Sequence, residues 1–170
     1  MRQTDKYLFF YGGFLSQWYL CKFNDWLRDY NCAEQCMMAQ KALLFEDIKS
    51  FDYIMKETNP AFQKARGRKI EGFNQEKWDL FKEAIVCSAN YLKFAQNKTL
   101  RKKLLDTKDL ILVEASPYDK IWGIGLSENN PLADDEKNWK GQNLLGKVLM
   151  KVRESLKNVD EQLSSLNNKE

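Results

Sequence analysis

Histidine is absent from this chain of 170 residues. Its absence excludes mechanisms in which an imidazole acts as general base, such as Ser-His and Cys-His hydrolysis, and metal sites built on histidine ligands. Any acid–base or nucleophilic chemistry must therefore come from Asp, Glu, Lys, Tyr or Cys side chains. If the chain is an enzyme, we expect its mechanism to use carboxylate or lysine side chains.

Proline and glycine are also scarce, with three and eight residues, which disfavours long loops and all-β architectures with many tight turns. No apolar run approaches the roughly 18 residues that cross a bilayer. The N-terminal residues 1–6 lead into a short aromatic run without the small-residue cleavage site of a signal peptide. We therefore expect a cytoplasmic protein that does not contact membranes.

The four cysteines lack the close Cys-x-x-Cys pairs of a zinc site, because they stand at positions 21, 32, 36 and 87. A disulfide framework is equally unexpected in a chain of this size with an ample supply of core residues. We expect reduced cysteines in or near a core. Neither a metal nor a cofactor is expected.

What the chain does contain is enough apolar material for one folded domain. Hydrophobic residues make up 44% of the sequence, and ten Phe, seven Tyr and five Trp argue against disorder. The net charge of +3, from 27 basic and 24 acidic residues, permits contact with a phosphate or a nucleic acid without requiring it.

The pattern of apolar residues predicts an α+β fold that is predominantly α-helical, in a single compact domain over residues 1–153. A small β element is expected near the N-terminus, where residues 7–30 have an extended pattern that begins with an aromatic strand at 7–11. Capping residues and apolar spacings predict the other elements: helices at 31–44, 47–57, 60–67, 75 onward, 99–105 and 142 onward, and a buried strand at 110–113. Residues 154–170 are expected to form a polar helical tail that frays into solvent.

The segment NCAEQCMMAQKA, residues 31–42, places an acid and an amine on one helical face. Glu34 and Lys41 are seven residues apart, so they differ by about 20° around the helix and by roughly 10 Å along it. That arrangement suits two groups that flank one substrate atom. The alternative is structural: Glu34 stands three residues after Asn31, as in a capping box, and Lys41 is a surface residue.

The segment ARGRK, residues 65–69, gathers Arg66, Arg68 and Lys69 at the expected end of a helix, with Gly67 as its stop. Arginine binds phosphate with two parallel hydrogen bonds and suits a nucleotide ligand. Alternatively, these cations only complement the dipole at the helix C-terminus.

The segment LVEASPYDKIWGIG, residues 112–125, places polar groups in a loop after a buried strand. Glu114 ends the strand, and Asp119 precedes Trp122 and Gly123. Such loops carry site residues, glycine allows a ligand to approach, and a tryptophan can stack on a base. The alternative is an ordinary turn with a packed tryptophan.

The segment GQNLLGKVLMKVR, residues 141–153, opens the last helix with Gly141, Asn143 and Gly146. Free N–H groups at a helix start can hold a phosphate. A glycine-rich helix start is a weak signal when it stands alone.

In this order, the segments resemble the NADAR family, also called YbiA-like. The family pattern has an aromatic segment before a Ser-Asn-Phe step, a helix with Glu and Lys seven residues apart, a Pro–Ala–Gly-Arg segment, a helix with a tryptophan, a Leu-Val-Glu strand, an Asp-x-x-Trp-Gly loop and a Gly-x-Asn-x-Leu-Gly helix start. The counterparts here are Ser16-Gln17-Trp18, Glu34 to Lys41, Pro60 to Arg68, Trp78, Leu112-Val113-Glu114, Asp119 to Gly123, and Gly141 to Gly146. The resemblance covers residues 7–153. This chain departs from the family at Gln17-Trp18, which replaces Asn-Phe, and at Cys32, where many members carry Ser or Thr.

The resemblance implies an N-glycosidase that hydrolyses the bond between ribose C1 and a base nitrogen. We expect it to remove ADP-ribose from ADP-ribosylated guanine in nucleic acid. Two alternatives stay open: hydrolysis of phosphoribosylaminopyrimidine intermediates of riboflavin synthesis, and a non-catalytic module that binds ADP-ribose. The protein is expected to act as a monomer.

The roles assigned to the side chains follow from an oxocarbenium-like transition state, which needs negative charge near C1. We expect Glu34 to stabilise the sugar or activate water, and Asp119 to be a second acid–base or ribose-binding carboxylate. Lys41 either steadies a phosphate or attacks C1 as an imine-forming nucleophile. The substrate-binding residues that we expect are two arginines that hold phosphate, two tryptophans that stack on the base, and the remaining motif positions: Arg66, Gly67, Arg68, Trp78, Glu114, Trp122, Gly123, Asn143 and Gly146.

Overall fold

Two strands that are a hundred residues apart in the sequence pair in the computed structural model, which describes residues 1–167. β2 (Tyr7–Phe10) pairs antiparallel with β1 (Arg2–Gln3) and parallel with β5 (Ile111–Glu114), in the order β1-β2-β5. All four residues of β2 are buried, as a continuous apolar strand requires. Both expected strands are confirmed to within one residue.

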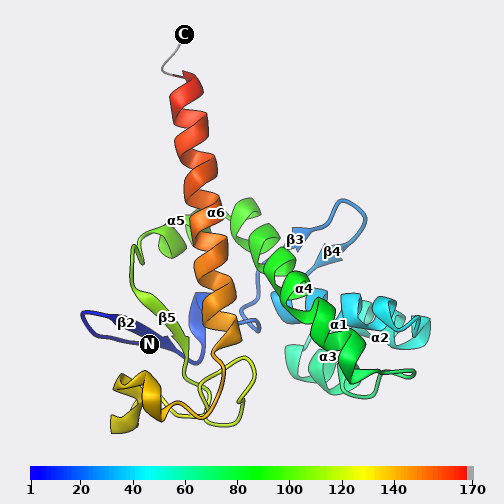
Figure 1. Cartoon of the computed structure of the whole chain (residues 1–170). Helices are drawn as coiled ribbons and strands as arrows, with labels where there is room; N and C mark the ends of the chain where they lie inside the picture. Colours follow the sequence, from blue (N-terminus) through cyan, green and yellow to red (C-terminus); the bar gives the residue numbers. More distant parts are fainter. Residues whose placement is uncertain (168–170) are drawn as a thin grey trace. The chain divides into compact units, whose positions relative to one another are not determined.

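The chain divides into two compact units. Unit 1 joins residues 1–16 to the residues from Lys98 onward, and unit 2 comprises residues 17–97. The expected α+β, mainly helical fold is confirmed (Figure 1). None of the helices within residues 1–167 is both long and apolar enough to cross a membrane.

Unit 1 carries the small sheet, α5 (Lys98–Leu105) and α6 (Leu144–Asn167). The loop between β5 and α6 contains two short 3-10 helices, η2 (Pro131–Asp134) and η3 (Glu136–Asn138). Apolar residues of this loop share one core with the sheet: Tyr7, Phe9, Val113, Ala115, Ile124, Leu126 and Ala133.

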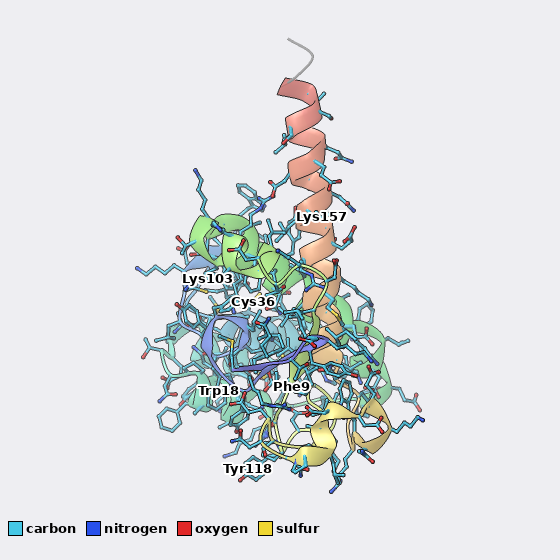
Figure 2. All side chains as sticks on the ribbon, turned by 90° about the vertical axis from the view of Figure 1, so that its left-hand side faces the viewer. Phe9, Trp18, Cys36, Lys103, Tyr118 and Lys157 are labelled. Carbon is cyan, nitrogen blue, oxygen red and sulfur yellow. The ribbon has the colours of Figure 1, made fainter. Side chains whose placement is uncertain are left out.

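α6 continues well beyond Arg153 as a regular helix, so the fraying expected after that residue is wrong. Leu156 is still fully buried, and Arg101 of α5 forms a 2.6 Å ion pair with Asp160. Farther along, exposed side chains such as Lys157 project from the helix (Figure 2). The last three residues of the expected tail, 168–170, lie outside the described residues.

Unit 2 is built around α1 (Ala33–Leu44), which packs against α2 (Ile48–Lys56), α3 (Pro60–Gly67) and α4 (Gln75–Gln96). The expected helices are present with their boundaries shifted by a residue or two. Their capping follows the sequence: the side chains of Asp47, Asn59 and Asn74 accept backbone N–H groups at the starts of α2, α3 and α4.

The extended pattern expected over residues 7–30 is only partly correct. Beyond β2 it contains a short 3-10 helix, η1 (Gly13–Leu15), and an antiparallel hairpin of two short strands, β3 (Phe23–Asn24) and β4 (Asp29–Tyr30). The intervening residues 17–22 have no regular secondary structure. β4 leads directly into the start of α1.

A fully buried lysine lies inside unit 2. Lys93 of α4 has its Nζ 5.0 Å from the ring centroid of Phe94 and 5.7 Å from that of Tyr19. Burial lowers the pKa of Lys93 to about 8, although the nearby Cys21 and Cys32 oppose the shift. The folded chain therefore holds the proton of this amine more weakly than the unfolded chain does.

Replacing Lys93 with Met tests that energetic cost. Between about pH 8 and the ordinary value of 10.5, the unfolded chain binds more protons at this group, so its contribution to stability rises with pH. The Cys32 and Cys36 thiols, whose pKa burial raises to about 11 and about 12, act in the opposite direction. The difference between wild type and Lys93→Met isolates the lysine.

We expect Lys93→Met to raise the free energy of unfolding by up to about 3 kcal/mol near neutral pH, and the gain to shrink toward pH 10.5. Urea unfolding of both proteins across this pH range measures the difference. A difference that does not change with pH contradicts the prediction.

Candidate active site

The start of α1 differs from the sequence expectation by one residue. Cys32, not Asn31, is the N-cap, and its Sγ accepts the N–H of Gln35 at 3.4 Å. Glu34 is therefore the second residue of the helix. The capping-box alternative, which needs Glu34 at the third position, is wrong. The charge of Glu34 instead lies in the first turn of α1, where the helix dipole favours an anion.

The backbone of Glu34 is held by the backbone of Gln17, whose side chain pairs with that of Asn90. The N–H of Glu34 donates to the carbonyl of Gln17 at 2.9 Å. The Gln17 side chain is itself fixed, because its Oε1 accepts from Asn90 Nδ2 at 2.7 Å and its Nε2 lies 3.7 Å from Met37 Sδ. All four residues are buried. The Glu34 carboxylate is therefore carried by a backbone segment that is buried and held by hydrogen bonds.

Sequence reasoning missed both amides. Gln17 was noted only as a departure from the family's asparagine. Asn90 lies four residues from both Val86 and Phe94 on the buried face of α4, and its Nδ2 also donates to the carbonyl of Val86 at 2.8 Å. A polar residue on a helix face that is otherwise apolar is the signal that points to such a role.

Lys41 lies on α1 in a half-buried aromatic setting. Its Nζ donates to the carbonyl of Gly67 at 3.0 Å. The same atom lies 4.3 Å from the ring centroid of Phe73 and 5.2 Å from that of Trp78. Two rings and a carbonyl therefore define the position of the amine.

The charges around Lys41 change its acidity. Burial lowers the pKa of Lys41, the guanidinium of Arg68 lowers it further, and the carboxylate of Glu34 partly opposes both. A larger fraction of this amine is neutral near physiological pH than for an ordinary lysine. The structure thus gives the seven-residue spacing a physical meaning: Glu34 and Lys41 influence each other's charge.

The aromatic residues divide their roles differently from the expectation. Trp78 is only 7% exposed and faces the Lys41 amine, so little of its ring is open, and its role in stacking on a base stays a prediction. Phe73, which is 41% exposed and was not singled out from the sequence, is the more open ring beside the amine. Its position between Gly72, with φ of +68°, and the Asn74 cap marks the turn that brings it there.

Gly67 brings α3 close to α1. A Cβ at this position would lie 2.0 Å from the Sδ of Met38. Gly67 is still helical, and Arg68 forms the C-cap, so the glycine is required by packing rather than by a left-handed turn. The resulting close approach lets the Gly67 carbonyl reach Lys41.

The two arginines of the ARGRK segment have separate surroundings. Arg66 donates from Nε to Ser50 Oγ at 2.9 Å, and Ser50 in turn hydrogen-bonds the Asp47 carboxylate. This network ties α3 to the start of α2, so Arg66 has a structural role. Arg68 is exposed, and its positive charge lowers the pKa of Lys41. Of the two, Arg68 is the one placed to meet a phosphate.

The motif residues of unit 1 connect β5 to α6. The N–H of Glu114 donates to Asn143 Oδ1 at 3.0 Å, and Asn143 Nδ2 donates to the carbonyl of Leu112 at 2.9 Å. Asn143 is buried, and its side chain satisfies the open edge of β5 as a neighbouring strand would. The Asn143 side chain thus holds the edge of β5, and its expected role in binding a substrate stays a prediction.

The start of α6 does not offer the free N–H groups expected for a phosphate. The amides of Leu144 and Leu145 donate to the carbonyls of Ile121 and Trp122 at 3.2 and 3.1 Å. A Cβ on Gly146 would lie 2.0 Å from the carbonyl oxygen of Leu112. Gly146 therefore permits close helix–strand packing, and the phosphate site expected here is wrong.

Asp119 shapes the loop between β5 and α6. Its Oδ1 accepts the N–H groups of Ile121 and Trp122 at 2.9 and 2.8 Å, as in an Asx turn. Gly123 packs closely against this loop, because a Cβ there would lie 2.9 Å from the carbonyl oxygen of Glu114 and 3.0 Å from that of Asp119. Trp122 is half-buried. Roles of Asp119, Glu114, Trp122 and Gly123 toward a substrate stay predictions.

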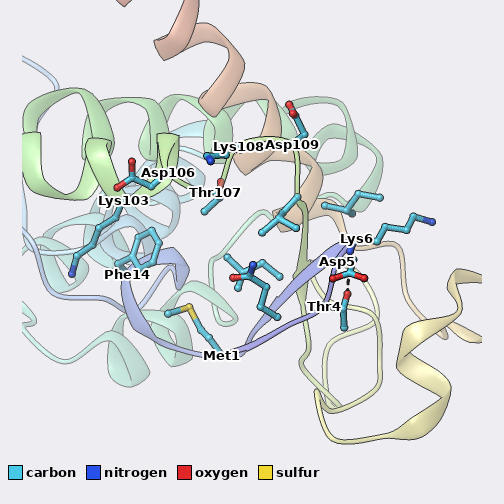
Figure 3. A pocket seen from close by; sticks show the side chains of 14 residues that line it. Met1, Thr4, Asp5, Lys6, Phe14, Lys103, Asp106, Thr107, Lys108 and Asp109 are labelled. Carbon is cyan, nitrogen blue, oxygen red and sulfur yellow. Dashed lines mark hydrogen bonds between the residues drawn. The ribbon is translucent and has the colours of Figure 1, made fainter.

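Unit 1 also has an open pocket of about 980 Å³ beside the N-terminal strands (Figure 3). Its lining mixes both charges and contains none of the expected site residues: Met1, Gln3, Thr4, Asp5, Lys6, Leu8, Phe14, Lys103, Asp106, Thr107, Lys108, Asp109, Leu110 and Ile111. Within the described part of the chain, no three Cys, Asp or Glu side chains are grouped as metal ligands. The candidate site of unit 2 therefore rests on Glu34, Lys41 and Arg68.

Known proteins share both the fold and the motifs. The profile of the NADAR domain matches residues 9–157. The chain is 46% identical over 165 residues to N-glycosidase R617 of Acanthamoeba polyphaga mimivirus, which covers 89% of this chain and 97% of the relative. It is 43% identical over 132 residues to Protein irg-1 of Caenorhabditis elegans, which covers 76% of this chain and 62% of the relative.

A solved structure agrees with these relatives. The NMR structure of the Escherichia coli protein YbiA matches with a TM-score of 0.75 and 28% identity, over 95% of this chain and 90% of that one. The sequence named N-glycosidase YbiA from Escherichia coli strain K12 is 32% identical over 124 residues, which is 73% of this chain and 69% of the relative.

The Gln17–Asn90 pair can be tested by exchanging the two side-chain lengths. Gln17→Asn or Asn90→Gln alone mismatches the 2.7 Å hydrogen bond, and each should lower the rate of base release about tenfold. The double variant restores the combined length and should recover most of the rate. Asn130→Ala, which removes the 3.0 Å bond from the N–H of Leu132 to a side-chain amide in unit 1, is the control and should keep its activity. A double variant that is no better than the worse single variant refutes the positioning role.

Proposed function

The chain belongs to the NADAR domain family and hydrolyses N-glycosyl bonds, and we propose that its substrate is guanine that carries ADP-ribose in nucleic acid. The observation that supports this most directly is the pair formed by Glu34 and Lys41 on one face of α1, with Arg68 beside the amine. A carboxylate, an amine whose pKa is lowered and a guanidinium match the three chemical needs of a phosphorylated ribosyl substrate.

The amine is suited to attack at C1. Neutral Lys41 Nζ adds to C1 of the ribose, the bond from C1 to the base nitrogen breaks, and one proton of the amine goes to that nitrogen. The bond from C1 to the ring oxygen then opens, and the second amine proton goes to that oxygen. The product is an imine between Lys41 and the sugar. One water molecule then hydrolyses the imine, releases ADP-ribose and restores the amine, so that the net reaction consumes one water.

Glu34 supplies negative charge where the reaction develops positive charge. In a dehydrated setting, a fixed carboxylate stabilises an oxocarbenium-like sugar more strongly than it would in water. The same carboxylate is suited to activate the water that completes hydrolysis. Arg68 is proposed to hold a phosphate of the ADP-ribose, since a guanidinium offers two parallel donors to phosphate oxygens.

The competing functions make different demands on the same residues. A phosphoribosylaminopyrimidine has one phosphate and no nucleic acid around it, and a binding-only module has no need for a lysine with a lowered pKa. Release of free base from ADP-ribosylated guanine in DNA, compared with release from a phosphoribosylaminopyrimidine, separates the three cases. We further propose that the protein works in the cytoplasm as a monomer and without a metal.

Glu34→Gln keeps the size of the side chain and removes its charge. We expect turnover to fall on the order of 100-fold or more, while the melting temperature stays the same or rises because a buried charge is lost. Glu76→Gln alters an exposed acid in the first turn of α4 and serves as control. Near-normal turnover of Glu34→Gln would remove Glu34 from the chemistry.

The role of Lys41 is decided by a conservative substitution. Arginine cannot form an imine, so we expect Lys41→Arg to be as inactive as Lys41→Ala, and borohydride added during turnover to trap a sugar adduct on wild type only. Lys77→Arg is the matched control, because Lys77 Nζ also donates to a carbonyl near a helix end, that of Leu44 at 2.8 Å. An active Lys41→Arg enzyme without any trapped adduct would assign Lys41 to phosphate binding.

The dependence of rate on pH provides a second measurement on the same amine. Since the Arg68 guanidinium lowers the pKa of Lys41, Arg68→Gln should raise that pKa. The acidic limb of the rate profile then moves to higher pH, whereas Arg68→Lys keeps the cation and the limb stays near its wild-type position. A phosphate-binding lysine would not produce this shift.

A further inference from the structure

The hairpin β3–β4 of unit 2 exposes two large apolar side chains at its tip. Trp26 is 89% exposed and Leu27 is 80% exposed. The hairpin projects as a loop beside α4 (Figure 1). Single exposed apolar residues are common on protein surfaces, but an almost fully exposed tryptophan is not what folding alone favours.

The backbone at the tip is strained by the residue that occupies it. Asp25 N donates to the carbonyl of Arg28 at 3.1 Å and closes a turn with Trp26 and Leu27 at its centre. Trp26 has φ of +72°, and Leu27 does not have a positive φ. This matches the hairpin turn in which glycine is preferred at the first central position. A tryptophan there opposes both the backbone preference and the tendency to bury its ring.

The stem of the hairpin is held firmly. Asp25 Oδ1 accepts the N–H groups of Leu27 and Arg28 at 3.1 and 2.8 Å, and its Oδ2 accepts from the Tyr30 hydroxyl at 2.7 Å and from Gln40 Nε2 of α1 at 3.3 Å. These bonds fix the tip to the helix that carries Glu34. The exposed ring is therefore presented on a rigid support.

A second anchor comes from α4. Gln96 accepts from the N–H of Asn24 at 3.0 Å and donates to its carbonyl at 2.7 Å. Both strands of the hairpin are thus braced against helices of unit 2, while the two tip side chains are left in solvent.

We propose that Trp26 and Leu27 form an apolar wedge that stacks on a base near the modified guanine in a nucleic-acid substrate. This inference rests on the proposed function, and it selects nucleic acid over a small metabolite. An enzyme that works on a base must take it out of the stack, and a rigid aromatic side chain compensates the lost stacking. Leu27 beside it matches the apolar wedges that other proteins insert between bases.

The size of the tip favours a base over a protein partner. An aromatic side chain buries about 150–250 Å², so two tip residues bury about half of the roughly 800 Å² per partner that a stable protein interface needs. A single ring is enough to stack on a base, and the interaction tolerates any sequence.

The reach of the hairpin is also appropriate. Trp26 lies five residues before Asn31, the residue that precedes the N-cap of α1, and an extended chain of that length spans at most about 17 Å. Stacked bases are about 3.4 Å apart. The wedge therefore reaches a base within about five nucleotides of one held at the start of α1.

The test compares two substrates that share the same scissile bond: ADP-ribosylated guanosine, and the same guanine within a single strand of about 12 nucleotides. We expect Trp26→Ala to lower kcat/KM for the oligonucleotide about tenfold and to leave the nucleoside unchanged. Trp26→Phe should keep most of the activity. Trp26→Gly should lose the oligonucleotide preference while its melting temperature rises, because glycine relieves the strained turn. Leu80→Ala truncates a side chain on α4 that has the same 80% exposure as Leu27. It should leave kcat/KM unchanged for both substrates.

Several outcomes overturn the inference. If Trp26→Ala lowers kcat/KM equally for both substrates, or for neither, the tip does not contact flanking nucleic acid. If Trp26→Ala changes the sedimentation of the protein alone and leaves the substrate preference unchanged, the tip instead contacts a second copy of the chain. If wild type turns over neither substrate, the proposed function fails by itself. The wedge is then judged by fluorescence anisotropy with an unmodified oligonucleotide, where weaker binding by Trp26→Ala supports it and equal binding refutes it.

Discussion

The close approach of α1 and α3 at Gly67 is the contact on which the chemistry of unit 2 depends. A Cβ there would come within 2.0 Å of Met38 Sδ and 2.9 Å of Met38 Cγ, so the Met38 side chain would have to move. In the present packing the Gly67 carbonyl lies 3.0 Å from Lys41 Nζ, and burial of that amine lowers its pKa. The absence of a side chain at Gly67 thus allows the packing in which this contact forms. An added methyl group must displace a neighbour, because protein interiors are packed at crystal-like density.

The opposite end of the same helix face is controlled by polar contacts rather than by packing. The Glu34 N–H is held by Gln17, and Gln17 is held by Asn90, all within a buried region. In a low dielectric these hydrogen bonds are strong when satisfied and costly when broken, so they hold the backbone segment that carries the Glu34 carboxylate. Glu34 and Lys41 are therefore fixed by two independent devices. Their electrostatic coupling across two turns of helix needs both devices to be intact.

Unit 1 shows that a motif can record packing as well as chemistry. Gly146 and Asn143 stand in a helix start that resembles an anion site, yet the first lets α6 lie against β5 and the second caps the edge of that strand. The amides at the helix start are satisfied by the carbonyls of the preceding loop. Asp119 likewise uses one carboxylate oxygen to hold that loop. Glycine and asparagine at fixed spacing arise from either cause, because both close packing and ligand approach require a small or capping side chain.

The sequence by itself determined the mainly helical α+β fold, nearly all helix boundaries, the two buried strands, and the family to which the chain belongs. These properties follow from apolar spacing, capping residues and ordered motifs, which act over a few residues at a time. It also determined the pairing of Glu34 with Lys41, since seven residues on a helix share a face. The tertiary structure decided which motif residues lie beside Lys41 and which pack against or cap other elements. Cys32 capped the helix instead of Asn31, Arg66 joined Ser50, Trp78 turned inward, and Phe73 and Asn90 entered the site. Each of these depends on contacts between residues far apart in the chain, and no local pattern specifies which long-range partner a side chain meets.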